Sequence, residues 1–152
     1  MKSIEEIEEY DKLKTKVLKF VLYKKRTEKE IRQKFNNEDE LMIDDIIYEL
    51  KDQKYIDDNS YIERAVNEFM SLNNLSIKEI SYKLAQKGIS KDLTNEYICQ
   101  NEEIMLEYEI NSAKSIISKR KRTSDIRDIK NFLYKKGYKG DSIKAAFEEG
   151  DL

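Results

Sequence analysis

Apolar residues recur along this chain at the spacing of a helix face. One stretch after residue 42 places four of them at i, i+3, i+4 and i+7, which is typical of a helix with one buried side: Ile43, Ile46, Ile47 and Leu50. Similar stretches follow Ser, Thr or Asp residues that suit helix N-caps. The pattern predicts nine helices. Six lie at about 4–25, 28–36, 42–53, 60–72, 77–87 and 102–121. A short one follows Ser90 and runs through Ile98, another follows Asp125 and ends near Lys136, and the last follows Asp141 and includes Phe147.

The same cap-and-core pattern occurs three times, 49 residues apart. The caps are Thr27, Ser76 and Asp125, and an isoleucine stands four residues after each, at Ile31, Ile80 and Ile129. Phe35, Leu84 and Leu133 come next, and the second and third copies end at Gly88 and Gly137. Such a period indicates stacked copies of one small unit. We expect an all-α fold, an elongated tandem array of three three-helix repeats: a helical extension (1–16), then 17–57, 58–101 and 102–152.

Composition agrees with a helical protein. The 152 residues include no Pro and four Gly, which are the residues that mark turns. Charged residues make up 39% of the chain, but hydrophobic residues make up another 39%, with ten Tyr and five Phe. That content is too apolar for a disordered chain.

The sequence also predicts how several helices begin and end. Glutamates three residues after Ser3, Thr27 and Ser76 predict capping boxes. Asp57 and Asp58 precede an apolar helix, so we expect capping rather than metal binding from them, and we expect Asp141 to cap the last helix. We also expect Gly88 to adopt the left-handed conformation that ends many helices.

The net charge of −2 conceals a strong pattern. Residues 12–34 hold ten Lys/Arg and two Glu, and residues 114–139 hold ten Lys/Arg and two Asp, so each segment carries +8. Residues 35–113 carry −11, from seven basic and eighteen acidic residues. The two basic segments suit an anionic partner, either DNA phosphates or an acidic protein surface. Solvation of a highly charged helical surface is the alternative interpretation.

The residues of common catalytic sites are missing from the sequence. It has no His, and it lacks the glycine-rich loops that cradle phosphates. Cys99 has no His partner, so we expect it to be a small buried residue of the sixth helix. We therefore expect no enzyme activity, no cofactor and no metal site.

The single cysteine favours a reducing compartment. The acidic N-terminus does not resemble a signal peptide, and no run approaches the roughly 20 apolar residues of a membrane span. We expect a cytoplasmic, monomeric protein with no membrane contact.

Four segments carry motifs that occur together in one known family. The first is VLKFVLYKKRTEKEI at Val17–Ile31, and the second is YIDDNSY at Tyr55–Tyr61. The third is the set Ile80, Leu84, Lys87, Gly88 and Ile89, and the fourth is FLYKKGY at Phe132–Tyr138. In this order they resemble the opening, the linker between the first two repeats, a second-repeat signature and a third-repeat ending of the RecX family of RecA regulators. Lys54 stands where that family usually has Gly.

The resemblance implies a regulator, mainly an inhibitor, of the RecA recombinase. Family members bind the RecA–DNA filament, block its extension or promote its disassembly, and so limit strand exchange and repressor co-cleavage. The partner is then the RecA filament, with possible direct contact with DNA. The binding residues that we expect are the basic side chains of copies one and three: Lys24, Lys25, Arg26, Arg32, Lys119, Arg120, Arg122, Arg127, Lys130, Lys135 and Lys136.

Two other functions stay open. A helical DNA-binding module would use the basic segments on duplex DNA, although the acidic middle opposes this. A generic protein-interaction adaptor would need only the repeats. Tyr23, Tyr134 and Tyr138 lie near the basic segments, where stacking on bases is possible but core packing is the default.

Overall fold

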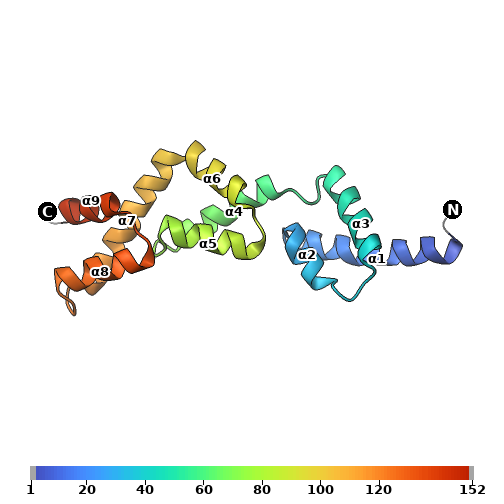
Figure 1. Ribbon diagram of the computed structural model, residues 1–152, viewed down its shortest axis with the longest axis horizontal. Coiled ribbons are helices and arrows are strands. Elements are labelled where there is room, and N and C mark those ends of the chain that lie inside the picture. Colours follow the sequence, from blue (N-terminus) through green and yellow to red (C-terminus); the bar gives the residue numbers. More distant parts are fainter. Residues whose placement is uncertain (1–2, 151–152) are drawn as a thin grey trace. The chain divides into compact units, whose positions relative to one another are not determined.

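The computed structural model of this protein describes residues 3–150, and over that range the secondary structure is helical, with no strand. The helices (Figure 1) are α1 Ile4–Tyr23, α2 Glu28–Lys34, α3 Glu40–Asp52, α4 Asp58–Ser71, α5 Ile77–Lys87, α6 Lys91–Gln100, α7 Glu102–Arg120, α8 Ile126–Lys136 and α9 Gly140–Gly150. They confirm the all-α array of three three-helix repeats. Residues 4–16 of the expected extension belong to α1, and residues 1, 2, 151 and 152 lie outside the described range. The repeat boundaries stay a prediction.

Side-chain caps begin most helices where the sequence predicts them. Thr27 and Glu30 form a reciprocal capping box, and Ser76 and Glu79 form another. The hydroxyl of Ser3 accepts a hydrogen bond from the backbone N–H of Glu6. Ser90 and Asp125 likewise accept from the N–H groups three residues on.

The caps predicted at Asp58 and Asp141 are wrong. Of the two aspartates before α4, only Asp57 caps the helix, because Asp58 is already its first residue. The Asp58 side chain is half-buried, and desolvation raises the pKa of its carboxyl above the usual range. The last helix begins at Gly140, so Asp141 lies in its first turn, and the carbonyl of Lys139 accepts the first helical bond, from Ile143 N–H.

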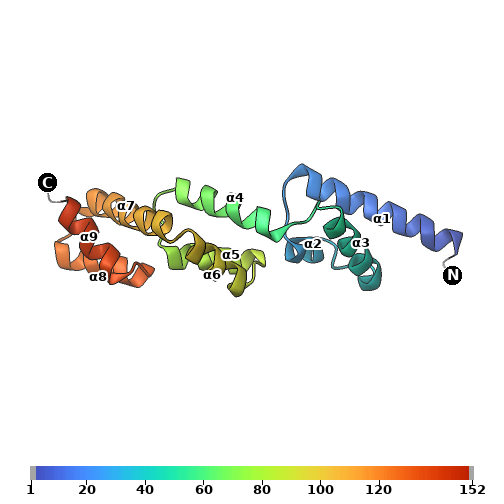
Figure 2. The ribbon, with the colours of Figure 1, turned by 90° about the horizontal axis from the view of Figure 1, so that it is seen from above.

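The chain divides into two compact units. The first runs up to Tyr61 and includes Lys87–Ile89; the second takes Ile62–Gln86 and the residues from Ser90 onward. In the first unit α1 packs against α3 (Figure 2). Its core is Leu13, Val17, Val21, Ile31, Ile43, Ile46, Ile47, Leu50 and Ile56.

In the second unit α9 packs along α7, and α8 contacts both (Figure 1). One core cluster of these helices is Ala113, Ile116, Ile117, Ile129, Leu133, Tyr138, Ile143 and Ala146. At the start of α7, the buried side of the helix does not follow the apolar residues of the sequence. Ile104 and Leu106 are exposed, while Met105, Tyr108 and Glu109 are buried. Cys99 is exposed, so its predicted burial is wrong; Thr94 is the buried residue of α6.

Each unit contains one copy of the same joint, in which a cap hydroxyl bonds a carbonyl sixty residues further on. In the first unit Thr27 Oγ1 donates to the carbonyl of Lys87. In the second, Ser76 Oγ donates to the carbonyl of Lys136 at 2.7 Å. The two contacts follow the 49-residue period, since Thr27 and Lys87 stand 49 residues before Ser76 and Lys136.

Ion pairs and glycines complete both joints. Glu30 pairs with Lys87 at 3.9 Å, and Glu79 pairs with Lys136 at 3.3 Å. Gly88 and Gly137 follow those lysines with φ of 97° and 96°, as the prediction for Gly88 required. A Cβ on Gly137 would lie 2.9 Å from Lys78 Cδ, so close packing as well as φ requires glycine there.

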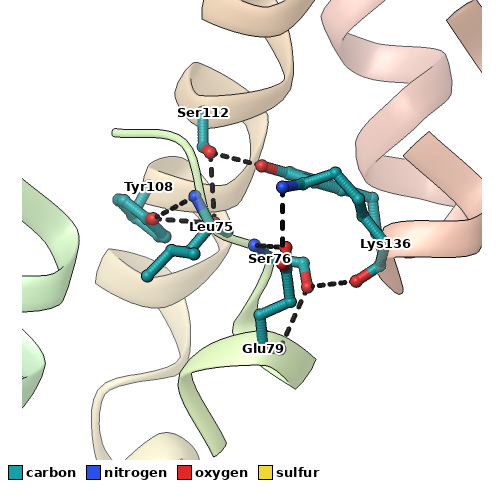
Figure 3. A network of polar contacts seen from close by, with 7 residues as sticks. Leu75, Ser76, Glu79, Tyr108, Ser112 and Lys136 are labelled. Atoms are coloured by element: carbon teal, nitrogen blue, oxygen red, sulfur yellow. Dashed lines mark hydrogen bonds and ion pairs between the residues drawn. The ribbon is translucent and has the colours of Figure 1, made fainter. Parts of the chain in front are cut away.

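A buried polar network supports the joint of the second unit (Figure 3). Tyr108 Oη donates to the carbonyl of Leu75 at 2.7 Å, and Ser112 Oγ donates to the same oxygen at 3.1 Å. Ser112 also shares a 2.6 Å hydrogen bond with Tyr138. The sequence pattern did not identify this network, because its polar members occupy positions of an otherwise apolar helix face.

Glu109 is the buried charge of this region, with no exposed surface. Its carboxylate accepts hydrogen bonds from the backbone N–H groups of Ile77, at 2.8 Å, and Lys139, at 2.9 Å. These groups lie at the starts of α5 and α9, where helix dipoles favour a negative charge. The two bonds offset the cost of burying the carboxylate.

Candidate binding surface in two basic regions

The first basic region surrounds the turn from α1 to α2, in the first unit. Lys24 and Lys25 are exposed, and Lys25 Nζ hydrogen-bonds Ser60 Oγ at 2.5 Å. The guanidinium of Arg26 lies 4.1 Å above the centre of the Phe20 ring, so a cation–π contact fixes its position. This part of the predicted site presents two exposed lysines beside one held arginine.

Arg32 is paired with acidic neighbours, although its side chain is partly exposed. Its NH1 atom lies 2.6 Å from Asp44, and its Nε atom lies 3.6 Å from Glu28. The hydrogen bond to Asp44 raises the pKa of Arg32 further above its already high value. Of the four residues predicted in copy one, Arg32 is therefore the one with the least charge available to a partner.

The second basic region covers the end of α7 and the exposed side of α8, in the second unit. The guanidinium of Arg120 stacks 3.4 Å above the Phe132 ring, and Lys136 Nζ lies 5.7 Å from the same ring. Lys130 Nζ lies 5.2 Å above Phe147. Four further predicted residues are exposed: Lys119, Arg122, Arg127 and Lys135. The predicted copy-three residues thus extend from the last turn of α7, through the connection, to the C-terminal end of α8.

A cation on a phenylalanine ring recurs in all three repeats. Lys34 lies over Phe20 at 5.9 Å, and Lys83 lies over Phe69 at 6.0 Å, at matching positions of the first two copies. In the third copy the positions are reversed: Phe132 occupies the position of Lys34 and Lys83 on the second helix, and the cation over its ring is Arg120 of the first helix. Arg120 therefore stands at the α7–α8 turn, where the first two copies have Leu22 and Ser71.

A shallow groove lies beside the second basic region, between α8 and α9. It has a volume of about 330 Å³ and is lined by Lys130, Tyr134, Gly140, Ile143, Lys144, Phe147 and Glu148. Two lysines from different helices flank an apolar floor. The groove therefore extends the basic surface toward α9, which the sequence pattern did not single out.

The three tyrosines near the basic regions differ in exposure. Tyr23 is 87% exposed and Tyr134 is 65% exposed, so the core packing expected by default is wrong for both. Tyr138 is buried and bonded to Ser112, which confirms core packing for this residue and excludes stacking on a base; burial also raises the pKa of its hydroxyl.

Residues 3–150 contain no cluster of three or more His, Cys, Asp or Glu side chains arranged to hold a metal ion. In the same range, every helix is too short or too polar to cross a bilayer.

The chain is similar in sequence to known proteins. The chain is 34% identical over 141 residues to the regulatory protein RecX of Finegoldia magna, covering 84% of this chain and 66% of that protein. It is 30% identical over 155 residues to that of Staphylococcus haemolyticus, covering 98% and 58%. The chain thus spans about three fifths to two thirds of the length of these curated relatives. No protein-family model matches the chain.

A solved structure shares the fold. The crystal structure of RecX from Lactobacillus salivarius superimposes with a TM-score of 0.80 at 26% sequence identity, covering 96% of this chain and 99% of that one. The match extends over the helical array and is not confined to one repeat.

Proposed function

This chain belongs to the RecX family of regulatory proteins, and from that premise we propose that it regulates the RecA recombinase, mainly as an inhibitor. It binds the RecA–DNA filament in the cytoplasm as a monomer, and blocks extension or promotes disassembly. Strand exchange and repressor co-cleavage fall as a result. The observation that carries the proposal is the family relationship over 84% of the chain.

Regulation of this kind needs no catalysis. A protein that binds one filament state more tightly than another shifts the equilibrium between them by its difference in affinity. The fold offers a binding surface for this purpose in the two basic regions. The crystal structure of RecX from Lactobacillus salivarius shares the helical array that presents these regions in this chain.

The second basic region is the contact that we propose as the stronger one. Arg120 is held on Phe132, so its guanidinium loses little freedom when a carboxylate or phosphate binds. Arg122, Arg127 and Lys135 are exposed around it. Pairing lowers the available charge in both regions. In the first region it involves two of the four predicted residues, Arg26 with Glu30 and Arg32 with Asp44, and in the second it involves Lys136 with Glu79, so the second region keeps more of its predicted charge.

To test the proposal, the purified protein is added to RecA that has been assembled with ATP on single-stranded DNA. ATP hydrolysis and filament mass are followed over time, and both are expected to fall at protein concentrations well below that of RecA. No change at excess protein, with normal helical content by circular dichroism, contradicts the proposal.

A charge-reversal pair then tests the site. Arg120→Glu with Arg122→Glu is expected to weaken the inhibition, and Arg64→Glu with Lys91→Glu in the second repeat is the control of equal charge change. Losing the Phe132 contact costs roughly 0.5–1 kcal/mol of stability, so thermal unfolding is measured for both pairs. Unchanged inhibition by the first pair would refute the site while leaving the regulator proposal intact.

A further inference from the structure

One side of α1 carries a stripe of lysines that ends in an aromatic ring. Lys12, Lys16, Lys19 and Tyr23 stand at i, i+4, i+7 and i+11 of this helix. At 3.6 residues per turn they fall within a sector of about 60°, over an axial length of about 16 Å. All four are exposed, and Tyr23, at 87%, is the most exposed large apolar side chain of the described residues.

The core fixes the direction in which this stripe faces. Leu13, Val17 and Val21 of the same helix are buried, and they lie about 100–180° around the helix from Lys12. Packing of these three residues in the first unit therefore holds the lysine stripe away from the core.

α1 has no acidic residue after Asp11, although Glu8 and Glu9 stand one turn before Lys12 at the start of the stripe. Residues 12–27 contain seven Lys/Arg and no Asp/Glu. Lys14, on a different side of α1, pairs with Glu49. Within residues 3–150, Lys12, Lys16 and Lys19 form no ion pair.

The ring of Tyr23 lies at the last residue of α1. The next residue, Lys24, is extended, with φ −156° and ψ 141°, and is itself exposed. No ring or cation of the described chain stacks on Tyr23. A flat aromatic face and a further lysine are thus available beside the stripe.

We propose that this stripe binds single-stranded nucleic acid directly, with Lys12, Lys16 and Lys19 on backbone phosphates and one base stacked on Tyr23. Sites for single strands combine these two elements, a basic track and an exposed aromatic ring. A duplex satisfies the lysines but offers no unstacked base to the ring. This inference goes beyond the proposed function, because it requires no RecA.

Because the chain has no Trp, Tyr23→Trp introduces a single fluorescent reporter at the proposed stacking position. We expect its emission to be quenched by single-stranded oligothymidylate, and far less by a duplex of equal length. Tyr48→Trp on α3 is the control, since Tyr48 is 75% exposed and lies near Asp44 and Asp45. Its emission is expected to stay unchanged.

Loss of affinity tests the same contacts without a reporter. Tyr23→Ala is expected to weaken oligonucleotide binding roughly tenfold. Lys16→Gln with Lys19→Gln is expected to reduce the salt dependence of binding by roughly 1.4 in log–log slope, at about 0.7 for each phosphate contact. Lys54→Gln with Lys91→Gln, two exposed lysines elsewhere, is the control pair.

Three results would overturn the inference. Oligonucleotide binding that leaves the emission of the Tyr23→Trp variant unquenched refutes the stacking contact. A Tyr23→Ala variant that keeps its oligonucleotide affinity but loses RecA inhibition makes Tyr23 a protein contact. Absence of oligonucleotide binding with RecA inhibition intact refutes this inference alone and leaves the proposed function standing.

Discussion

Ser76 joins two helix ends that lie sixty residues apart in the chain. Its hydroxyl donates to the carbonyl oxygen of Lys136 at 2.7 Å, and the hydroxyl oxygen itself accepts from the backbone N–H of Glu79 at 3.1 Å (Figure 3). Ser76 is fully buried. One side chain therefore caps α5 and also satisfies a carbonyl at the end of α8, as Thr27 does for α2 and the end of α5.

Replacing Ser76 by Ala removes both bonds, and we expect a loss of about 2–3 kcal/mol in the free energy of unfolding. Urea denaturation measures this loss. Ser90→Ala is the matched control, because Ser90 caps α6 but is exposed, and it should cost about 1 kcal/mol. Equal losses for the two variants would show that the bond to Lys136 contributes nothing beyond the cap.

Glu109 is expected to be the most sensitive charged residue of the second unit. Glu109→Ala leaves the amides of Ile77 and Lys139 without their acceptor, and should cost about 3 kcal/mol. Hydrogen exchange at these two amides should accelerate more than at the rest of α5 and α9. The exposed Glu107→Gln is the control, and a loss as large as that of Glu109→Ala would contradict the explanation.

Lys54 adopts a left-handed conformation, with φ of 63°, at the position where the resemblance leads one to expect Gly. A residue with a Cβ pays about 1–2 kcal/mol there, while Gly loses roughly 0.5–1 kcal/mol in chain entropy. Lys54→Gly should therefore stabilise the protein by about 0.5 kcal/mol in thermal unfolding. Lys54→Ala keeps the backbone cost and should give no gain; a gain as large as that of Gly would point to relief of charge instead.

Glu28 links stability to pH in the first unit. Its carboxylate lies 2.5 Å from Lys51 Nζ, and this contact is the main reason that the pKa of Glu28 falls below 4.5. A lowered folded-state pKa contributes stability above the unfolded-state pKa, and that stability is lost as pH falls through the folded-state value.

The corresponding variant is Glu28→Gln. Wild type should exceed it in stability by about 0.5–1 kcal/mol at pH 7, and the difference should shrink below pH 4.5 and vanish on further acidification. Chemical denaturation of both proteins across this range measures the difference. A gap that persists unchanged after full acidification would show that the side chain acts through packing rather than charge.

The sequence alone determined the helices and their repetition. Isoleucines such as Ile31, Ile80 and Ile129 are all buried as predicted, because local spacing dictates which side of a short helix is apolar. Caps such as Thr27 and Ser76 depend on bonds within four residues, so they too could be read locally. Asp141 and Cys99 show the limit, since neighbouring elements decide where α9 begins and which side of α6 is covered.

Only the tertiary structure decided how these helices are joined and which charges are available. No local pattern shows that Ser76 meets Lys136, or that the burial of Glu109 is compensated by amides of two distant segments. Sequence also does not show that Arg32 is paired with Asp44 whereas Arg122 is exposed and available to a partner. The physical reason is that hydrogen bonds within a helix follow from sequence separation, whereas contacts between helices depend on packing of the whole chain.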